Sequence, residues 1–219
     1  MFRAYDAAFV VHERRMRMQK QLKDLNLIDD FLFFSLLNDE VIGEKFGRKL
    51  LEIIFNRKFG KLKIVPQKVY YGTDTDKHGV RLDVYMEEEV DNQTLLKNST
   101  IFDVEPEGES KKENADELPQ RIRFYHSKID AGCLGSGKDY RSLKKVIVVM
   151  IMPFDPFGYG HMIYTIQNKC LEVPELPYDD GAKTLFLYTR GENGNPTEAL
   201  RELLYYMEDS SKTNVKNEH

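Results

Sequence analysis

Residues 99–107 read STIFDVEPE, an apolar, β-branched and aromatic run with acidic side chains at alternate positions. Residues of this kind favour a β-strand, and side chains alternate between the two faces of a strand. Asp103, Glu105 and Glu107 are therefore predicted to share one face. A strand with this pattern is expected to lie inside a sheet and to carry a row of carboxylates on one side.

Asp83 is a further acidic residue in a strand-like setting, because it lies within VRLDVY at residues 80–85. If this strand pairs with the first one, four carboxylates meet on one surface, which is costly unless a cation neutralises them. Mg²⁺ prefers oxygen ligands and needs few carboxylates, since it keeps several waters. We therefore interpret Asp83 and Glu105 as ligands of a divalent metal, Mg²⁺ or Mn²⁺. The alternative, that these are ordinary solvated acids at strand ends, stays open on this pattern alone.

Composition limits the classes of function. The chain has 219 residues, 41% of them hydrophobic, and a formal net charge of −4, so a uniformly polycationic nucleic-acid binder is excluded. Its two cysteines, Cys133 and Cys170, have neither metal-site spacing nor a disulfide framework, which favours a cytoplasmic location. We find no signal-peptide stretch and no apolar run that can span a bilayer, so we expect no membrane association.

Hydrophobic periodicity predicts one α/β domain with a mixed β-sheet flanked by helices. A short helix is expected after Asp29 and Asp30, and the last helix is expected to begin at the cap Asn195 with Pro196 in its first turn. Two more helices are predicted at residues 39–55 and 118–133, and strands are predicted at residues 62–71, 80–87, 99–107, 146–152, 161–167 and 184–189.

The two ends of the chain differ from the domain between them. Residues 1–23 carry six basic and two acidic side chains, a local charge of +4, and form a basic N-terminal extension. This extension is either a solvated helix or arm, or an arm that binds a nucleic acid or a protein partner. Residues 24–209 form the predicted domain, and residues 210–219 are expected to be a disordered tail.

Several segments in order resemble the PD-(D/E)XK nuclease family transposases, the group of recombination-promoting nucleases and putative transposases. The resemblance covers roughly residues 22–207 by eye. The segments that carry it are LNLIDDF at 25–31, VRLDVY at 80–85, FDVE at 102–105, LPQRIRFYH at 118–126, GKDY at 137–140, FDPFG at 154–158 and YTIQNKC at 164–170.

This resemblance implies a restriction-endonuclease-like core that cleaves DNA with a metal ion at one sheet edge. Asp83 matches the first acidic position of the family motif and Glu105 the second. The third position normally carries Lys or Gln, whereas this chain has Glu107. A Lys there can orient water and stabilise negative charge, while Glu adds a further negative charge. Lys111 and Lys112 are nearby in sequence and are candidates for the missing cation.

Side chains on the helices predicted at residues 118–133 and 39–55 extend the candidate site. Gln120, Arg121 and Lys128 are candidates for contact with DNA, since Arg121 and Lys128 share one side of the helix with Tyr125. Glu52 is a further acidic candidate, because related nucleases place an acid on the helix before the sheet. The alternatives are solvated cations and an ordinary surface glutamate.

Three functions follow from these observations. The first is an Mg²⁺-dependent DNA endonuclease connected with a mobile element or with recombination, and a homo-oligomer is compatible with this function. The second is a nuclease-fold DNA-binding or interaction protein that has lost catalysis, and Glu107 is its main support. The third is a protein-interaction module that uses residues 1–23 and the last helix.

Overall fold

The computed structural model describes residues 24–71, 79–88 and 99–211, so the basic extension and most of the predicted tail lie outside the described residues. The elements are α2 (Asp30–Asn38), α3 (Gly43–Phe55), β1 (Leu62–Pro66), β2 (Val69–Tyr70), β3 (Val80–Arg81), β4 (Val84–Glu88), β5 (Thr100–Pro106), the 3₁₀ segment η2 (Glu109–Glu117), α4 (Leu118–Cys133), the 3₁₀ turn η3 (Tyr140–Ser142), β6 (Lys145–Met152), β7 (Ile163–Gln167), β8 (Ala182–Tyr188) and α5 (Glu198–Glu208).

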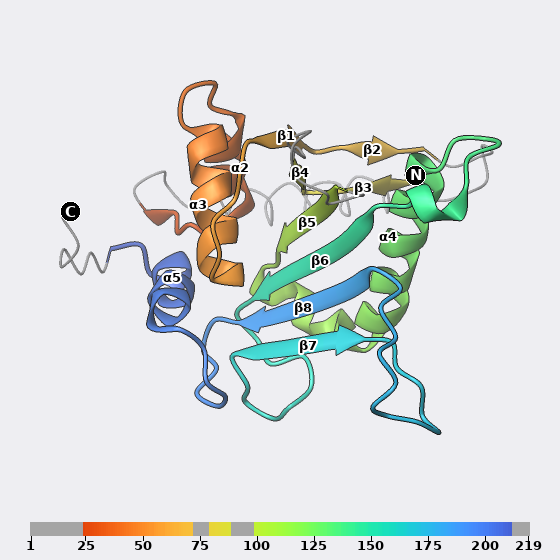
Figure 1. The fold of residues 1–219 in the computed structure, drawn as a ribbon. Helices are drawn as coiled ribbons and strands as arrows, with labels where there is room; N and C mark the ends of the chain where they lie inside the picture. Colours follow the sequence, from red (N-terminus) through yellow and green to blue (C-terminus); the bar gives the residue numbers. More distant parts are fainter. Residues whose placement is uncertain (1–23, 72–78, 89–98, 212–219) are drawn as a thin grey trace, which may run out of the picture.

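The main sheet has six strands in the order β1-β4-β5-β6-β8-β7, and β2 and β3 form a separate pair (Figure 1). β5 runs parallel to β6 and β6 parallel to β8, whereas the pairs β1–β4, β4–β5 and β7–β8 are antiparallel. This confirms the predicted α/β class with a mixed sheet. The pairing expected between the strands predicted at residues 80–87 and 99–107 is also present, as the pair β4–β5.

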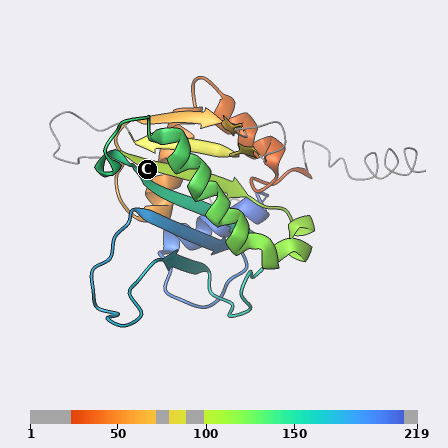
Figure 2. The ribbon, with the colours of Figure 1, turned by 90° about the vertical axis from the view of Figure 1, so that its right-hand side faces the viewer.

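The helices cover both faces of this sheet. One core contains side chains of α2, α3 and α5 together with Val84, Phe102 and Val104 of the sheet. The other core lies under α4 and contains Ile101 and Val148 from the opposite face of the same strands. Figure 2 shows α4 crossing the near face of the sheet, with α3 and α5 on the far side. The acidic residues of β5 alternate with Phe102 and Val104, so they belong to the α4 face.

The predicted strand at residues 80–87 is interrupted at Asp83, which lies in a bend between β3 and β4. The main-chain N–H of Gln67 donates to the carbonyl oxygen of Asp83 over 2.8 Å, and the N–H of Leu82 donates to that of Lys68 over 2.8 Å. Gln67 has a φ of 53°, in the left-handed region, so the opposing chain bends at the same level. This paired distortion turns Asp83 towards the end of β5.

Several predicted boundaries differ in the structure: the strand predicted at residues 62–71 is divided into β1 and β2, and two further differences lie at helix α3 and at the predicted tail. α3 begins at Gly43 and not near Asp39, because the Asp39 carboxylate accepts hydrogen bonds from the N–H groups of Val41 and Ile42, which forms a turn before the helix. Ser210, the first residue of the predicted tail, is bound on both sides: its hydroxyl accepts from the N–H of Leu27, and its N–H donates to Asn26 Oδ1. No helix among the described residues is long and apolar enough to cross a membrane.

Candidate metal and phosphodiester site

Three acidic side chains, two in β5 and one directly after it, are buried at the sheet. Asp103, Glu105 and Glu107 have relative exposures of 0%, 3% and 5%. Their burial follows from the position of β5 in the middle of the sheet, between β4 and β6. Buried carboxylates are costly unless they are paired or neutralised, so this row calls for a charge partner.

Asp83 joins this row through its main chain. Its N–H donates to Glu105 Oε1 over 2.7 Å, a bond that takes the place of a ladder bond at the point where the pairing of β4 with β5 ends. We call Asp83, Asp103, Glu105 and Glu107 the acidic cluster. Burial, followed by the charges of Asp30 and Glu107, raises the pKa of Asp83 to about 6. The structure therefore brings the main chain of Asp83 next to the Glu105 carboxylate, and, after burial and the charge of Asp103, the charge of Asp83 contributes to the raised pKa of Glu105.

Asp103 is the most isolated member of the acidic cluster. It is fully buried, and neither of its carboxylate oxygens meets a hydrogen-bond donor within the described part of the chain. Burial raises its pKa to about 8, and burial together with the charge of Asp103 raises the pKa of Glu105 well above its ordinary value. The two carboxyl groups can share a hydrogen bond only when one of them is protonated. The fold therefore disfavours the ionised forms of these two acids, which a bound cation would favour.

α4 contributes the cation that is paired with the acidic cluster. Arg121 forms an ion pair with Glu107 through its Nη2 and the glutamate Oε1. Burial, the largest single cause, lowers the pKa of Arg121, but the charge and hydrogen bond of Glu107 together with the charges of Tyr125 and Glu105 raise it overall. Tyr125, one turn further along α4, has its pKa raised by burial and by the charge of Glu105. The face of α4 that covers β5 is therefore polar at this level.

The other predicted site residues do not reach the acidic cluster. Gln120 is exposed, and its amide points back to the carbonyl oxygens of Asp116 and Glu117, 3.2 Å away from each. Lys128 lies over the ring of Phe124 at 5.3 Å. Glu52 forms an ion pair with Lys58 at 3.1 Å, and its helix α3 packs on the opposite face of the sheet. The structure brings together Asp83, Glu105, Glu107 and Arg121 of the predicted set.

Two residues near the site were not assigned to it from sequence. Asp30, interpreted only as the acidic start of a helix, raises the pKa of Asp83 by its charge. Its own pKa is raised by burial and lowered by the charge of Lys111. Asp103 was placed on the acidic face but given no role. The pair of aspartates before residues 31–34 was the signal for Asp30, although a helix N-terminus explains such a pair equally well.

The geometry suits a small number of metal ligands. No group of three or more His, Cys, Asp or Glu side chains in residues 24–71, 79–88 and 99–211 is arranged to hold a metal ion. The arrangement offers two neighbouring carboxylates, Asp83 and Glu105, with Arg121 close to them. Such a set can bind a hydrated divalent cation and a phosphate, but it does not form a closed protein cage.

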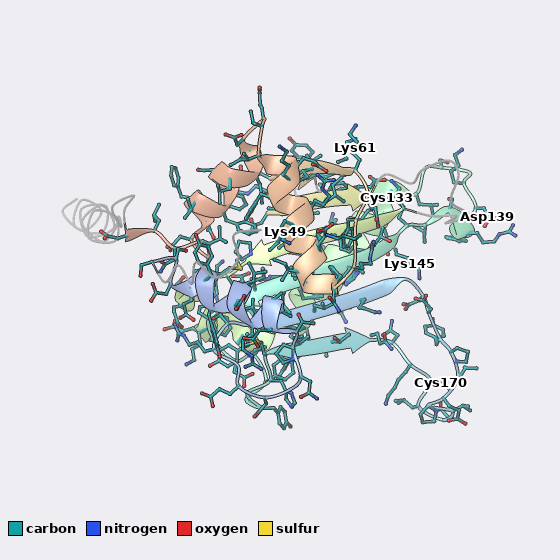
Figure 3. All side chains as sticks on the ribbon, turned by 60° about the vertical axis from the view of Figure 1, so that its left-hand side comes forward. Lys49, Lys61, Cys133, Asp139, Lys145 and Cys170 are labelled. Carbon is teal, nitrogen blue, oxygen red and sulfur yellow. The ribbon has the colours of Figure 1, made fainter. Side chains whose placement is uncertain are left out.

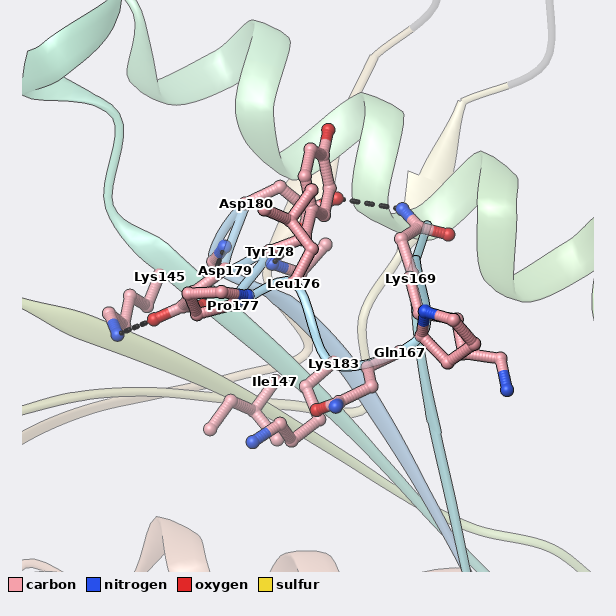
Figure 4. Close-up of a pocket in the computed structure, with 14 residues that line it drawn as sticks. Lys145, Ile147, Gln167, Lys169, Leu176, Pro177, Tyr178, Asp179, Asp180 and Lys183 are labelled. Carbon is pink, nitrogen blue, oxygen red and sulfur yellow. Dashed lines mark hydrogen bonds and ion pairs between the residues drawn. The ribbon is translucent and has the colours of Figure 1, made fainter. Parts of the chain in front are cut away.

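Other features of the molecule are separate from the acidic cluster. A cavity of about 320 Å³ lies at the first residues of β6 and β8, whereas the acids lie towards the last residues of β5 (Figure 4). The cavity is lined by Lys145, Ile147, residues 167–169, Pro174 and residues 176–183. An ion pair between Lys145 and Asp179, 2.7 Å long, closes part of its wall. The two cysteines are free and lie well apart in Figure 3.

Comparisons of the chain with protein-family models, with curated proteins and with solved structures found no significant match in any of the three.

Proposed function

We propose that this chain is a metal-dependent DNA endonuclease with a core of the PD-(D/E)XK type, acting in the cytoplasm on DNA in connection with a mobile element or recombination. The observation that carries the proposal is the meeting of Asp83 and Glu105 on one face of the sheet, joined by the hydrogen bond from the Asp83 N–H to the Glu105 carboxylate. Residues far apart in sequence are thereby brought to one point, as the resemblance to these nucleases requires.

The residues fit Mg²⁺ or Mn²⁺ as a partly hydrated ion. The fully buried Asp103 has no donor for its oxygens among the described residues, and the pKa values of Asp83, Asp103 and Glu105 are all raised. These are signs of carboxyl groups whose ionised forms lack a partner in the folded protein and would gain one from a cation. Asp83 and Glu105 would hold the ion, with water in the remaining positions. When bound, the ion would supply a polarised water and positive charge next to the phosphate.

The protein residues have separate parts in this proposal. The hydrogen bond from the main chain of Asp83 would hold the Glu105 carboxylate in place next to Asp83 before any ligand arrives. α4 excludes water from Asp103 and Glu105, which strengthens electrostatic interactions in the site. Asp83 is the more accessible of the two ligands, so the phosphodiester would approach from its side.

Nicking of supercoiled plasmid in Mg²⁺ or Mn²⁺, compared with EDTA, tests the proposal. Asp83→Asn and Glu105→Gln keep side-chain size and are expected to lower the nicking rate by about 100-fold or more. Glu88→Gln is the matched control, because Glu88 pairs with Arg57 at the far end of β4. Unchanged nicking in both site variants would remove the assignment.

A catalytically impaired nuclease-fold DNA-binding protein is the second candidate. Its support is Glu107 at the third motif position, together with the lack of a closed set of metal ligands among the described residues. This candidate predicts DNA binding that weakens steeply with salt, and no nicking by the wild type in either metal. Nicking that appears only after Glu107→Lys would favour it over the first.

A further inference from the structure

Arg121 and Glu107 come from different elements and meet in the acidic cluster. Glu107 follows β5, and its side chain is 7% exposed, whereas Arg121 lies on the first half of α4 with 26% of its side chain exposed. Lys111, which sequence offered as a nearby cation, acts on Asp30 instead. Arg121 of helix α4 therefore places positive charge next to Glu107, the residue that stands where the resemblance leads us to expect Lys or Gln.

The guanidinium of Arg121 has donors to spare. Arginine carries five N–H groups in a planar fork and stays charged at any physiological pH. The Nη2 atom bonds to Glu107, while Nε is buried without a hydrogen-bond partner among the described residues. An unpartnered buried donor is costly, and the side chain as a whole is 26% exposed, so it still has donors to offer an acceptor that arrives with a ligand.

The position of this charge indicates the class of ligand. Arg121 lowers the pKa values of both Asp83 and Asp103 by its charge, so it lies within electrostatic reach of the acids proposed to hold the metal. The ring of Tyr125 lies 5.8 Å from the guanidinium carbon and limits its movement on one side. The two non-bridging oxygens of a phosphodiester match the fork geometry of arginine.

We propose that Arg121 contacts the phosphodiester that is cleaved and supplies the positive charge that a lysine would supply at position 107, with Glu107 as the residue that positions it. This inference rests on the function proposed above. In the reaction a water oxygen forms a bond to phosphorus and releases one proton to solvent, and one P–O ester bond breaks. The leaving oxygen takes a proton from solvent. Arg121 keeps its protons and donates hydrogen bonds to a non-bridging phosphate oxygen, where negative charge increases in the transition state.

The test must separate this role from simple balancing of a buried charge. Arg121→Gln alone would leave Glu107 buried without a partner, so it is paired with Glu107→Gln, which gives a neutral pair able to hydrogen-bond. A second double variant, Arg121→Gln with Glu107→Lys, moves the cation from the helix to the strand. Arg123→Gln is the matched control, because Arg123 is exposed on the same helix.

Three quantities are measured for each protein: the plasmid-nicking rate at saturating DNA in Mg²⁺, the binding of a short DNA duplex by fluorescence anisotropy in Ca²⁺, and the melting temperature. We expect the neutral double variant to nick about 100-fold more slowly or worse, with duplex binding weakened less than about tenfold. The variant with Lys at position 107 is expected to recover to within about tenfold of wild type, and Arg123→Gln to nick like wild type. Melting temperatures close to wild type would show that all variants fold.

Any of the following four results would overturn the inference. Wild-type nicking by the neutral double variant would mean that Arg121 only balances Glu107. No recovery with Lys at position 107 would mean that the charge itself is not what catalysis needs. Equal losses in nicking and in duplex binding would place Arg121 in general DNA affinity. Wild-type protein that fails to nick while binding the duplex would overturn the proposed function as well, which distinguishes that failure from the others.

Discussion

The two faces of β5 differ in the side chains that they bury. Phe102 and Val104 enter the apolar core beneath α2, α3 and α5, whereas the face beneath α4 buries Asp103 and Glu105 beside Ile101 and the second apolar core. All five are almost completely buried. Burial of apolar surface stabilises the fold, while burial of unpaired carboxylates opposes it. The buried acids on the α4 face therefore lower the stability of the fold, as ionisable groups at functional sites commonly do.

The largest effect is expected on the apolar face. Phe102 is 1% exposed, and its ring lies 5.1 Å from that of Phe55 and 5.4 Å from that of Phe59. Phe102→Ala should lower the free energy of unfolding by about 3–5 kcal/mol, because it removes buried surface and leaves a cavity. Urea denaturation measures this change. A loss below about 1 kcal/mol would show that this face is not the main source of stability.

Substitution of the next residue, Asp103, is expected to change the free energy of unfolding in the opposite direction. Asp103→Asn should raise the free energy of unfolding at pH 8 by about 1–3 kcal/mol in EDTA, because it removes a buried carboxylate without a donor among the described residues. The control is Asp116→Asn, at an exposed aspartate of η2, which should leave stability unchanged. Destabilisation by Asp103→Asn would mean that the carboxylate has a stabilising partner in solution.

The same carboxyl makes stability depend on pH. The pKa of Asp103 in the folded protein is about 8, above the ordinary value of 3.8, so between these values the folded state binds more protons than the unfolded state. The free energy of unfolding should therefore fall as pH rises from 5 to 8 in EDTA. Asp83 and Glu105 act in the same direction, since their pKa values are also raised. Urea denaturation at both pH values should show a smaller fall in Asp103→Asn than in wild type.

A divalent cation should reduce the loss of stability that comes from burying carboxylates on the α4 face. Mg²⁺ at ten times its dissociation constant should stabilise the wild type by about 1.4 kcal/mol, because it binds the folded state. Asp83→Asn should lose most of this gain, whereas Glu88→Gln should keep it. Thermal denaturation with and without Mg²⁺ measures the difference. An equal gain in the wild type and in Asp83→Asn would place the cation elsewhere.

Much of the fold could be predicted because burial leaves a regular pattern in sequence. The apolar run at residues 146–152 became β6, and the helix predicted at residues 118–133 is α4 with the same ends. The break at Asp83 could not be predicted in this way. It depends on the bend at Gln67 in the opposing chain, and the sequence VRLDVY alternates without interruption. Local pattern finds elements, but it does not record where a neighbouring strand distorts them.

The candidate site was predicted in part for the same reason. Alternation placed Asp103, Glu105 and Glu107 on one face, and the structure agrees. The ion pair of Glu107 with Arg121 was missed, because it depends on how α4 crosses the sheet. Glu52 was placed near the site by analogy, but the packing of α3 puts its helix on the other face. Contacts between layers depend on packing geometry that one sequence does not show.

The start of α5 gives the smallest and most local prediction. Asn195 was the expected cap, but the observed cap is Thr197, whose hydroxyl oxygen accepts from the Leu200 N–H over 3.3 Å. Thr197→Ala should lower the free energy of unfolding by about 1 kcal/mol, and Asn195→Ala, the control, should have little effect. Because α5 packs only on the apolar face, we expect unchanged plasmid nicking in both variants. A loss of nicking by Thr197→Ala, at a temperature where the variant stays folded, would show that the two faces are coupled through the sheet.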